Sequence, residues 1–277
     1  MTALITGGTG QVGSALRALV SDADAPGRGL LDLSEPAGIV PYLDAHRPTA
    51  ILNAAAYTAV DRAEEEEELA TTVNGTSVGV LAEWAARHEV PFLTFSTDYV
   101  FDGTSPAPYP EDHPVDPINA YGRSKAAGEA AALEANPDAL IVRTSWVISG
   151  THPNFVATIV RIARERTLSV VDDQWGCPTI NTDLAAAAVG ALRAGATGIL
   201  HLANQGPTTW FRLARAAVEH AGIDPGRVSP CATADYPTPA RRPANSVLVS
   251  TRLGALGLPP LPPWTAGLPA LVRRLTA

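Results

Sequence analysis

The sequence predicts an α/β fold, a Rossmann-type doubly wound parallel sheet with a smaller lobe toward the C-terminus. Short apolar segments alternate with Ala-rich segments of helical pattern, the order that right-handed strand–helix–strand crossovers produce. The apolar segments are nearly continuous, as in strands buried on both faces. Beyond about residue 204 the composition shifts and prolines cluster, at 225–243 and again at 259–263.

Each expected element can be assigned a range. The strands should cover 3–6, 50–56, 91–97, 139–147 and 198–203. Helical patterns cover 11–20, 62–88, 120–135, 182–194, 210–221 and 264–275. A further strand should follow the first helix, but "SDADAPGRGLLDLSEP" (21–36) offers only "GLLDL" as apolar material. Either this strand is very short or the sheet is eroded at that edge. The five glutamates at 64–68 are interpreted as a solvated helix face.

Composition excludes several classes of function. The chain has 277 residues, 46% of them apolar and only 17% charged, which indicates a globular protein. A net charge of −8 and a pI near 5.2 argue against binding to nucleic acid. The N-terminus lacks the features of a signal peptide, and no apolar run reaches the ~20 residues of a membrane helix, so a cytoplasmic protein is expected. Two cysteines, Cys177 and Cys231, support neither a disulfide framework nor a zinc site.

The segment "GGTGQVG" (7–13) follows the first strand and opens the first helix. Gly7, Gly10 and Gly13 allow a tight turn and close backbone approach, so that a pyrophosphate can lie on the helix N-terminus. At this junction the motif favours a bound dinucleotide. We therefore expect an NAD(P)-binding domain at 1–145, to which 168–200 returns, and a substrate-binding lobe formed by 146–167 and 201–277.

The choice between NAD and NADP is left open by the residues near the weak strand. Asp32 lies about twenty residues past the loop, where an acid can bind the adenosine ribose and favour NAD. Arg28 could instead bind the 2′-phosphate of NADP.

Two later strands end in segments suited to ligand contact. Ala54 to Ala56 are small enough for a ligand to approach, although tight packing would explain them equally well. "FSTDYVFDG" (95–103) places Ser96, Thr97 and Asp98 at the carboxyl end of a parallel strand, where ligands bind in such sheets. A hydroxyl there can donate a hydrogen bond to a carbonyl oxygen or cap a helix.

The segment "YGRSK" (121–125) contains the only lysine of the chain, against 19 arginines. Tyr121 and Lys125 are four residues apart and share a helix face. A nearby ammonium stabilises a phenolate and lowers the tyrosine pKa, and it can also bind ribose hydroxyls. Tyr121 would then donate a proton to a carbonyl while hydride arrives at carbon. Arginine is bulkier and permanently charged and cannot replace a compact ammonium.

Eight segments together resemble the dTDP-4-dehydrorhamnose reductase family of extended short-chain dehydrogenase/reductases, over almost the whole chain. They are "GGTGQVG", "NAAAYTAVDRAE", "STDYVFDG", "NAYGRSKAAGE", "RTSW", "NF", "VVDDQWGCPT" and "PTPARRPANS". The resemblance implies reduction of the C4 ketone of a dTDP-6-deoxysugar by NADPH or NADH, with Thr97, Tyr121 and Lys125 as the catalytic set.

The resemblance also implies the binding residues. Those for the cofactor are Gly7, Gly10, Gln11, Val12, Asp32, Leu33, Ala54, Ala55, Tyr57, Tyr121 and Lys125, beside the candidate Arg28. Those for the substrate are Val60, Asp98, Tyr99, Trp146, Asn154, Arg242 and Asn245. Trp146 offers an apolar wall for the sugar, and Arg242 a charge for the diphosphate.

Two departures from the family pattern have consequences. Ile148 stands where a tyrosine often follows "TSWV", which alters the expected sugar pocket. Ala15 replaces a glutamate that some members use in a metal-linked dimer, so no metal is expected, and the chain is a monomer or a homodimer. Together with the shortened second-strand region they suggest a divergent member of the family, a 4-ketoreductase for a deoxysugar of natural-product biosynthesis other than L-rhamnose.

Two rival functions come from the same superfamily. A dehydratase is disfavoured because Tyr99 stands where its carboxylate would be, whereas a nucleotide-sugar epimerase remains an alternative. A non-catalytic NADP-binding regulatory subunit is the other alternative, and it predicts that Tyr121→Phe leaves function untouched.

Overall fold

The computed structural model describes residues 2–276 of the chain. Its main sheet has five parallel strands in the order β1-β2-β3-β4-β9. The strands are β1 (Leu4–Thr6), β2 (Ile51–Asn53), β3 (Phe92–Thr97), β4 (Leu140–Thr144) and β9 (Gly198–His201). Each lies inside its predicted segment, and the predicted fold class is confirmed.

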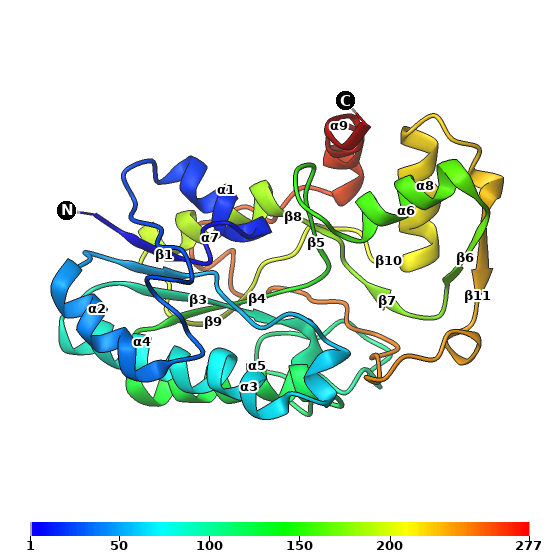
Figure 1. Ribbon diagram of the computed structural model, residues 1–277. Coiled ribbons are helices and arrows are strands. Elements are labelled where there is room, and N and C mark those ends of the chain that lie inside the picture. Colours follow the sequence, from blue (N-terminus) through cyan, green and yellow to red (C-terminus); the bar gives the residue numbers. More distant parts are fainter. Residues whose placement is uncertain (1, 277) are drawn as a thin grey trace.

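Helices cover both faces of the sheet (Figure 1). On one face lie α2 (Ile39–His46), α3 (Glu67–Thr71), α4 (Ser77–Arg87) and α5 (Ala120–Ala135). On the other lie α1 (Gln11–Leu19) and α7 (Asn181–Arg193), which pack against each other. The short helix α2 was not predicted from the sequence.

The weakly marked strand is reduced to a single backbone bridge on the outer side of β1. Asp24 forms this bridge with Leu4: its N–H donates to Ala3 O and its carbonyl accepts from Ile5 N, both at 2.8 Å. The expected "GLLDL" segment forms no strand. Its buried Leu31 and Leu33 pack into the core instead, so the edge is eroded rather than occupied by a short strand.

The helical pattern predicted over 62–88 is broken in the structure. A 3-10 turn at Arg62–Glu64 and α3 lead into a π-helical turn at Thr72–Thr76 before α4 begins. Single π-helical turns inside α-helices are frequently found at functional sites. The turn carries Asn74, a fully buried side chain whose contacts are described below.

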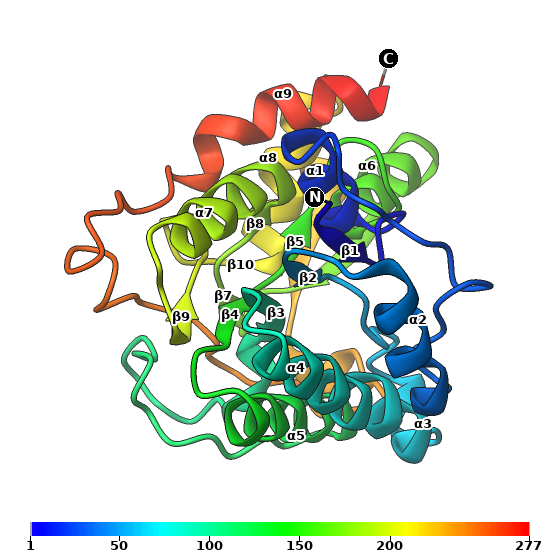
Figure 2. The same ribbon diagram turned by 90° about the vertical axis from the view of Figure 1, so that its left-hand side faces the viewer.

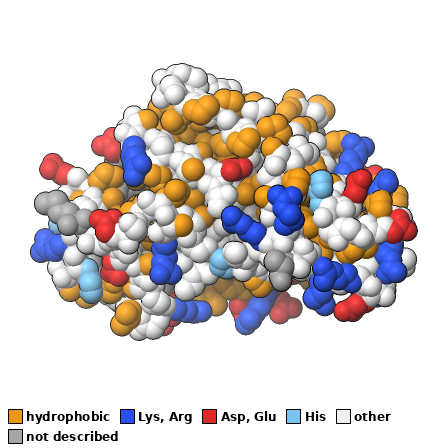
Figure 3. Space-filling model, turned by 90° about the horizontal axis from the view of Figure 1, so that it is seen from above, with side chains coloured by type: hydrophobic (Ala, Val, Ile, Leu, Met, Phe, Trp, Pro, Cys, Tyr) orange, Lys and Arg blue, Asp and Glu red, His pale blue; other side chains and the backbone are white. Residues whose placement is uncertain are grey.

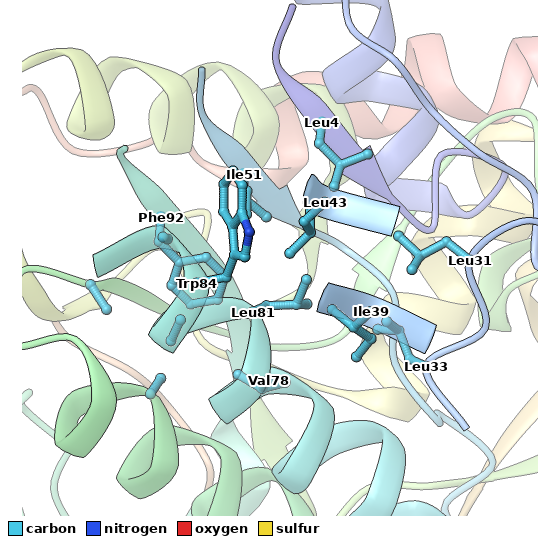
Figure 4. Packing of buried hydrophobic residues seen from close by; sticks show 14 of the residues in the cluster. Leu4, Leu31, Leu33, Ile39, Leu43, Ile51, Val78, Leu81, Trp84 and Phe92 are labelled. Carbon is cyan, nitrogen blue, oxygen red and sulfur yellow. The ribbon is translucent and has the colours of Figure 1, made fainter. Parts of the chain in front are cut away.

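A core of leucine, isoleucine and aromatic side chains joins the sheet to α2 and α4. Leu4, Ile51 and Phe92 project from three neighbouring strands toward Leu43 and Trp84 of these helices (Figure 4). The side chain of Trp84 is fully buried, and its ring N–H donates to Asp44 Oδ1 at 2.9 Å. Burial of such aromatic side chains fixes the helices against the strands whose ends form the site.

The remaining elements form short ladders beside the main sheet (Figures 1 and 2). They comprise β5 (Val147–Ile148) with β8 (Thr179–Ile180), β6 (Leu168–Val171) with β11 (Val228–Cys231), and β7 (Trp175–Gly176) with β10 (Thr208–Thr209). The accompanying helices are α6 (Phe155–Glu165), α8 (Trp210–His220) and α9 (Trp264–Thr276). The sequence predicts that 168–200 belongs again to the NAD(P)-binding domain. Because β6 pairs with β11 and not with the main sheet, this segment rejoins the main sheet only from α7 onward. The division into two lobes stays a prediction.

The surface features are compatible with a small ligand. Within residues 2–276, no helix is both long and apolar enough to span a membrane. Acidic and basic side chains lie interspersed on the face shown in Figure 3.

Candidate active site

The glycine-rich turn brings the start of α1 close to the end of β1. Gly7 has a left-handed φ of 66°, and its carbonyl accepts a hydrogen bond from Gly10 N at 2.9 Å. A Cβ on Gly13 would lie 2.1 Å from Gly7 O, so α1 can approach the turn only with glycine there. The arrangement leaves the first N–H groups of α1 available to an anion such as a pyrophosphate.

A cavity of about 340 Å³ opens beside this turn. Among the predicted cofactor residues it is lined by Gly7, Arg28, Asp32, Leu33, Ala55 and Tyr57. Four other predicted cofactor residues do not line the cavity, namely Gly10, Gln11, Val12 and Ala54. Of these, Gly10 belongs to the glycine-rich turn and Val12 to the start of α1. The buried Gln11 Oε1 has no hydrogen-bond partner among residues 2–276. A glycine-rich turn, a buried polar atom without a partner and a neighbouring cavity together suit a bound dinucleotide. These residues therefore fit NAD(P).

Arg28 and Asp32 are paired with each other at this cavity. Arg28 Nε donates to Asp32 Oδ2 at 2.9 Å, and Ser34 N donates to Asp32 Oδ1 at 2.8 Å. Arg28 Nη2 also reaches Ser34 Oγ at 3.2 Å. The carboxylate that would favour NAD is therefore held beside the cation that would favour NADP.

Helix α5 carries the predicted Tyr121 and Lys125. Asn119 caps it, accepting from Gly122 N at 2.7 Å, which is a regular N-cap geometry. Lys125 is 4% exposed, and its Nζ donates to Phe95 O of β3 at 2.6 Å. Burial lowers the pKa of Lys125 to about 8, against a smaller opposing effect of Glu129.

Tyr121 lies next to Thr97, the last residue of β3. Burial raises the pKa of Tyr121 to about 12, while a hydrogen bond with the Thr97 side chain lowers it and the charge of Asp98 raises it. This direction is opposite to the expected lowering by Lys125, because burial outweighs the effects that lower the pKa of Tyr121. Tyr121 is consequently a neutral phenol at neutral pH.

The run of glutamates is not simply a solvated face, contrary to the interpretation of the sequence. Glu64 Oε1 accepts from Ala120 N at 2.8 Å, and Glu67 binds the Arg123 guanidinium through both oxygens. Two glutamates thus hold the first turn of α5.

Asn74 is a second element of the site that the sequence did not reveal. Its Oδ1 accepts from Tyr57 N at 2.8 Å, and its Nδ2 donates to Tyr57 O at 3.0 Å and to Ser124 Oγ at 2.9 Å. It ties the cofactor cavity to α5. An asparagine inside a long Ala-rich helical pattern was the available signal.

Of the predicted substrate residues, Arg242 and Tyr99 lie together near Asp61. Arg242 Nη2 lies 3.0 Å from Asp61 Oδ1, and its guanidinium carbon is 6.0 Å from the centre of the Tyr99 ring. Tyr99 in turn meets Tyr121 edge-on, with ring centroids 5.9 Å apart. Val60 is next in sequence to Asp61.

Trp146 is held in an unusual conformation. Its φ is +47°, and its ring stacks on Trp210 with centroids 3.5 Å apart. A Cβ on Gly176 would lie 2.4 Å from the Trp146 ring. Non-glycine residues in this region of backbone conformation carry strain that surrounding contacts must hold, which is common at functional sites.

Asn154 and Asn245 are engaged within the chain. Asn154 caps α6, accepting from Ala157 N at 3.1 Å and donating to Ser149 O at 2.7 Å. Asn245 Nδ2 donates to Ser105 O at 2.8 Å. Both amides therefore hold loops in place through contacts within the chain.

A second cavity, of about 520 Å³, lies at the short ladders. Aromatic side chains and polar groups converge on it, among them Asp61, Phe155, Arg166, Gln174, Trp210, Tyr236 and Arg242. Apolar walls with a few convergent polar groups are typical of small-molecule sites. Across residues 2–276 no group of three or more His, Cys, Asp or Glu side chains could hold a metal ion.

Comparisons with known proteins agree with this geometry. The family model described as "RmlD substrate binding domain" matches residues 1–277. A dTDP-4-dehydrorhamnose reductase of Streptomyces griseus is 44% identical, with 98% of this chain and 94% of the relative covered. A dTDP-4-keto-6-deoxy-D-glucose reductase of Streptomyces niveus is 41% identical, with 96% and 94% covered.

Among solved structures, a dTDP-4-dehydrorhamnose reductase of Bacillus anthracis in complex with NADP superposes with a TM-score of 0.92. It is 34% identical and covers 98% of this chain and 99% of its own. The predicted enzyme class, an NAD(P)H-dependent oxidoreductase, is confirmed. The chain belongs to the RmlD substrate binding domain family, together with the dTDP-4-dehydrorhamnose reductases that its sequence motifs resemble.

Proposed function

We propose that the protein reduces the C4 ketone of a dTDP-4-keto-6-deoxysugar, dTDP-4-dehydro-L-rhamnose or a related deoxysugar of natural-product biosynthesis. The observation that carries the proposal is the contact between Tyr121 and Thr97 at the carboxyl end of β3. The glycine-rich turn lies at the same edge of the sheet. The relatives named for this reaction support the substrate class.

The residues of the chain have separate tasks in this reaction. When bound, NADPH or NADH supplies the hydride. Tyr121 donates its phenolic proton to the carbonyl oxygen, and its raised pKa keeps that proton in place at neutral pH. Thr97 donates a second hydrogen bond to the same oxygen. Lys125, fixed by the Phe95 carbonyl, presents its remaining N–H groups to the nicotinamide ribose.

The substrate side is assigned from charge and shape. Arg242, paired with Asp61 at the second cavity, would bind the diphosphate, and Trp146, stacked on the cavity-lining Trp210, would form a wall for the sugar. Asp32 and Arg28, paired at the adenosine end, favour use of both NADPH and NADH.

Replacement of the proton donor tests the catalytic part of the proposal. Tyr121→Phe should lower kcat about 10²- to 10⁴-fold, the usual contribution of a positioned proton donor. NADPH binding, followed by fluorescence titration, should change little. Tyr42→Phe is the matched control because Tyr42 bonds Asp24 on the far side of the cofactor turn. Full turnover of Tyr121→Phe would contradict the mechanism and favour the non-catalytic alternative.

The substrate class is tested directly. Incubation with NADPH and a panel of dTDP-4-keto-6-deoxysugars should oxidise NADPH stoichiometrically, and the C4 configuration of the product identifies the sugar. Conversion without net NADPH consumption would indicate an epimerase. No conversion of any member of the panel would overturn the proposed substrate.

A further inference from the structure

Asp98 is a buried carboxyl group directly behind the proposed proton donors. It begins the 3-10 turn at Asp98–Val100 that follows β3, and it is 2% exposed. Thr97 Oγ1 lies 3.0 Å from Asp98 Oδ1. Asp98 Oδ2 has no hydrogen-bond partner within residues 2–276, and none of the ion pairs there includes Asp98.

The Thr97 hydroxyl has one proton and two acceptor sites. One acceptor site is taken by Tyr99 N at 3.1 Å. If Asp98 is ionised, the single proton of Thr97 must be donated to the carboxylate, and none is left for Tyr121 or a substrate oxygen. If Asp98 is protonated, its O–H donates to the second acceptor site, and the Thr97 proton is free for donation.

The surroundings of Asp98 favour the protonated form. A carboxylate with one buried and unpartnered oxygen costs more than the neutral acid. Burial raises the pKa of Asp98 to about 7, against the Ser246 and Thr97 side chains, which lower it. The titratable groups that face it are Tyr99, Tyr121 and Cys177, whose pKa values are all raised chiefly by burial. These three groups stay uncharged near neutral pH.

We propose that Asp98 is a positioning residue that sets the direction of the Thr97 hydrogen bond, so that Thr97 is a donor toward the reacting carbonyl only while Asp98 is protonated. Asp98 acts through Thr97, and no net proton leaves it during turnover. The inference rests on the proposed function and adds to it a pH-dependent control of the same site.

The first test needs no substrate. A carboxyl whose folded pKa exceeds its unfolded value stabilises the fold less and less as pH rises between the two values. Asp98→Asn removes this titration with little change of shape. The melting temperature of the variant, relative to that of the wild type at the same pH, should therefore rise from pH 4 to pH 8. A difference that does not change with pH would overturn the proposal.

A second measurement covers the case in which Asp98→Asn does not fold. Wild-type protein labelled with 13C in its aspartate carboxyls should show one carboxyl resonance that titrates near pH 7. If every aspartate titrates below pH 5, the proposal is wrong.

The role in turnover is tested by a pH–rate profile and a double-mutant cycle. Wild-type kcat should begin to fall above about pH 7, and this fall should be absent in Asp98→Asn, leaving only the fall caused by Lys125 at higher pH. In a Thr97→Val background, Asp98→Asn should have no further effect on the profile. An equal effect with and without the Thr97 hydroxyl would contradict coupling through it. If no sugar is reduced at all, the proposed function fails, whereas the stability and resonance measurements still decide the state of Asp98.

Discussion

The glycine-rich turn at 7–13 and the surroundings of Trp146, which we call the sugar end of the site, differ in the kind of atoms that form them. Around Gly7 and Gly13 the site consists of backbone at the end of β1, which pairs with β2 in the parallel sheet. At Trp146 it consists of side chains from separate segments, stacked on Trp210 and pressed against Gly176 between two-residue strands. A backbone site tolerates almost no added atom, whereas stacked side chains can shift. From this comparison we expect rigid binding of the cofactor and adjustable contacts at the proposed sugar end.

The largest effect is expected from an added methyl group in the rigid region. In Gly13→Ala the new Cβ would meet Gly7 O at 2.1 Å, and only a backbone shift can relieve that contact. Overpacking of this kind costs about 1–3 kcal/mol. If this cost falls on binding, the dissociation constant of NADPH should rise about 5- to 150-fold, measured by fluorescence titration. Unchanged NADPH affinity would show that the turn is more adaptable than the sheet-bound geometry implies.

A smaller effect is expected from the same change at the sugar end. In Gly176→Ala the Cβ would meet the Trp146 ring at 2.4 Å, and the ring can move with its partner Trp210. KM for the sugar nucleotide should rise severalfold while the dissociation constant of NADPH stays the same. Gly13→Ala and Gly176→Ala thus serve as controls for each other. An effect of Gly176→Ala on NADPH binding alone would remove the distinction between the two regions.

The smallest effect is expected where the two regions meet, at the first turn of α5. Glu64→Gln keeps an acceptor for Ala120 N but removes the charge beside the helix N-terminus. The interaction of such a charge with the helix dipole contributes about 0.3–1 kcal/mol. We expect a fall of a few degrees in melting temperature and a modest loss of kcat at constant KM. Glu65→Gln, on the same turn, is the matched control; an equal effect of both would show that general charge, not the contact with α5, is responsible.

Much of the fold could be predicted because its signals are local. The strand at 92–97 and the helix at 120–135 follow from apolar continuity and from the Asn119 cap, and both lie where the sequence placed them. Tyr121 and Lys125 were identified from spacing and from the rarity of lysine. The contact of Tyr121 with Thr97 joins the first turn of α5 to the carboxyl end of β3, the edge at which ligands bind in parallel sheets.

What could not be predicted depends on contacts distant in sequence. The break in the helix at 62–88 places Asn74 between Tyr57 and Ser124, partners that periodicity does not reveal. The pKa of Tyr121 was expected to fall because the sequence shows a nearby lysine but not the burial of the tyrosine. Glu64 looked like a solvent-facing residue because its acceptor role requires Ala120, 56 residues away.

The eroded edge at Asp24 has a consequence for how this family can diversify. Beyond that single bridge, the loop that carries Arg28 and Asp32 belongs to no ladder. Insertions or deletions there break no ladder, and where they spare the buried Leu31 and Leu33 they cost chiefly loop-closure entropy, well under about 1 kcal/mol for a few residues. The residues that we expect to set coenzyme preference, Arg28 and Asp32, are thereby separated from the paired strands, so their replacement need not disturb the catalytic centre.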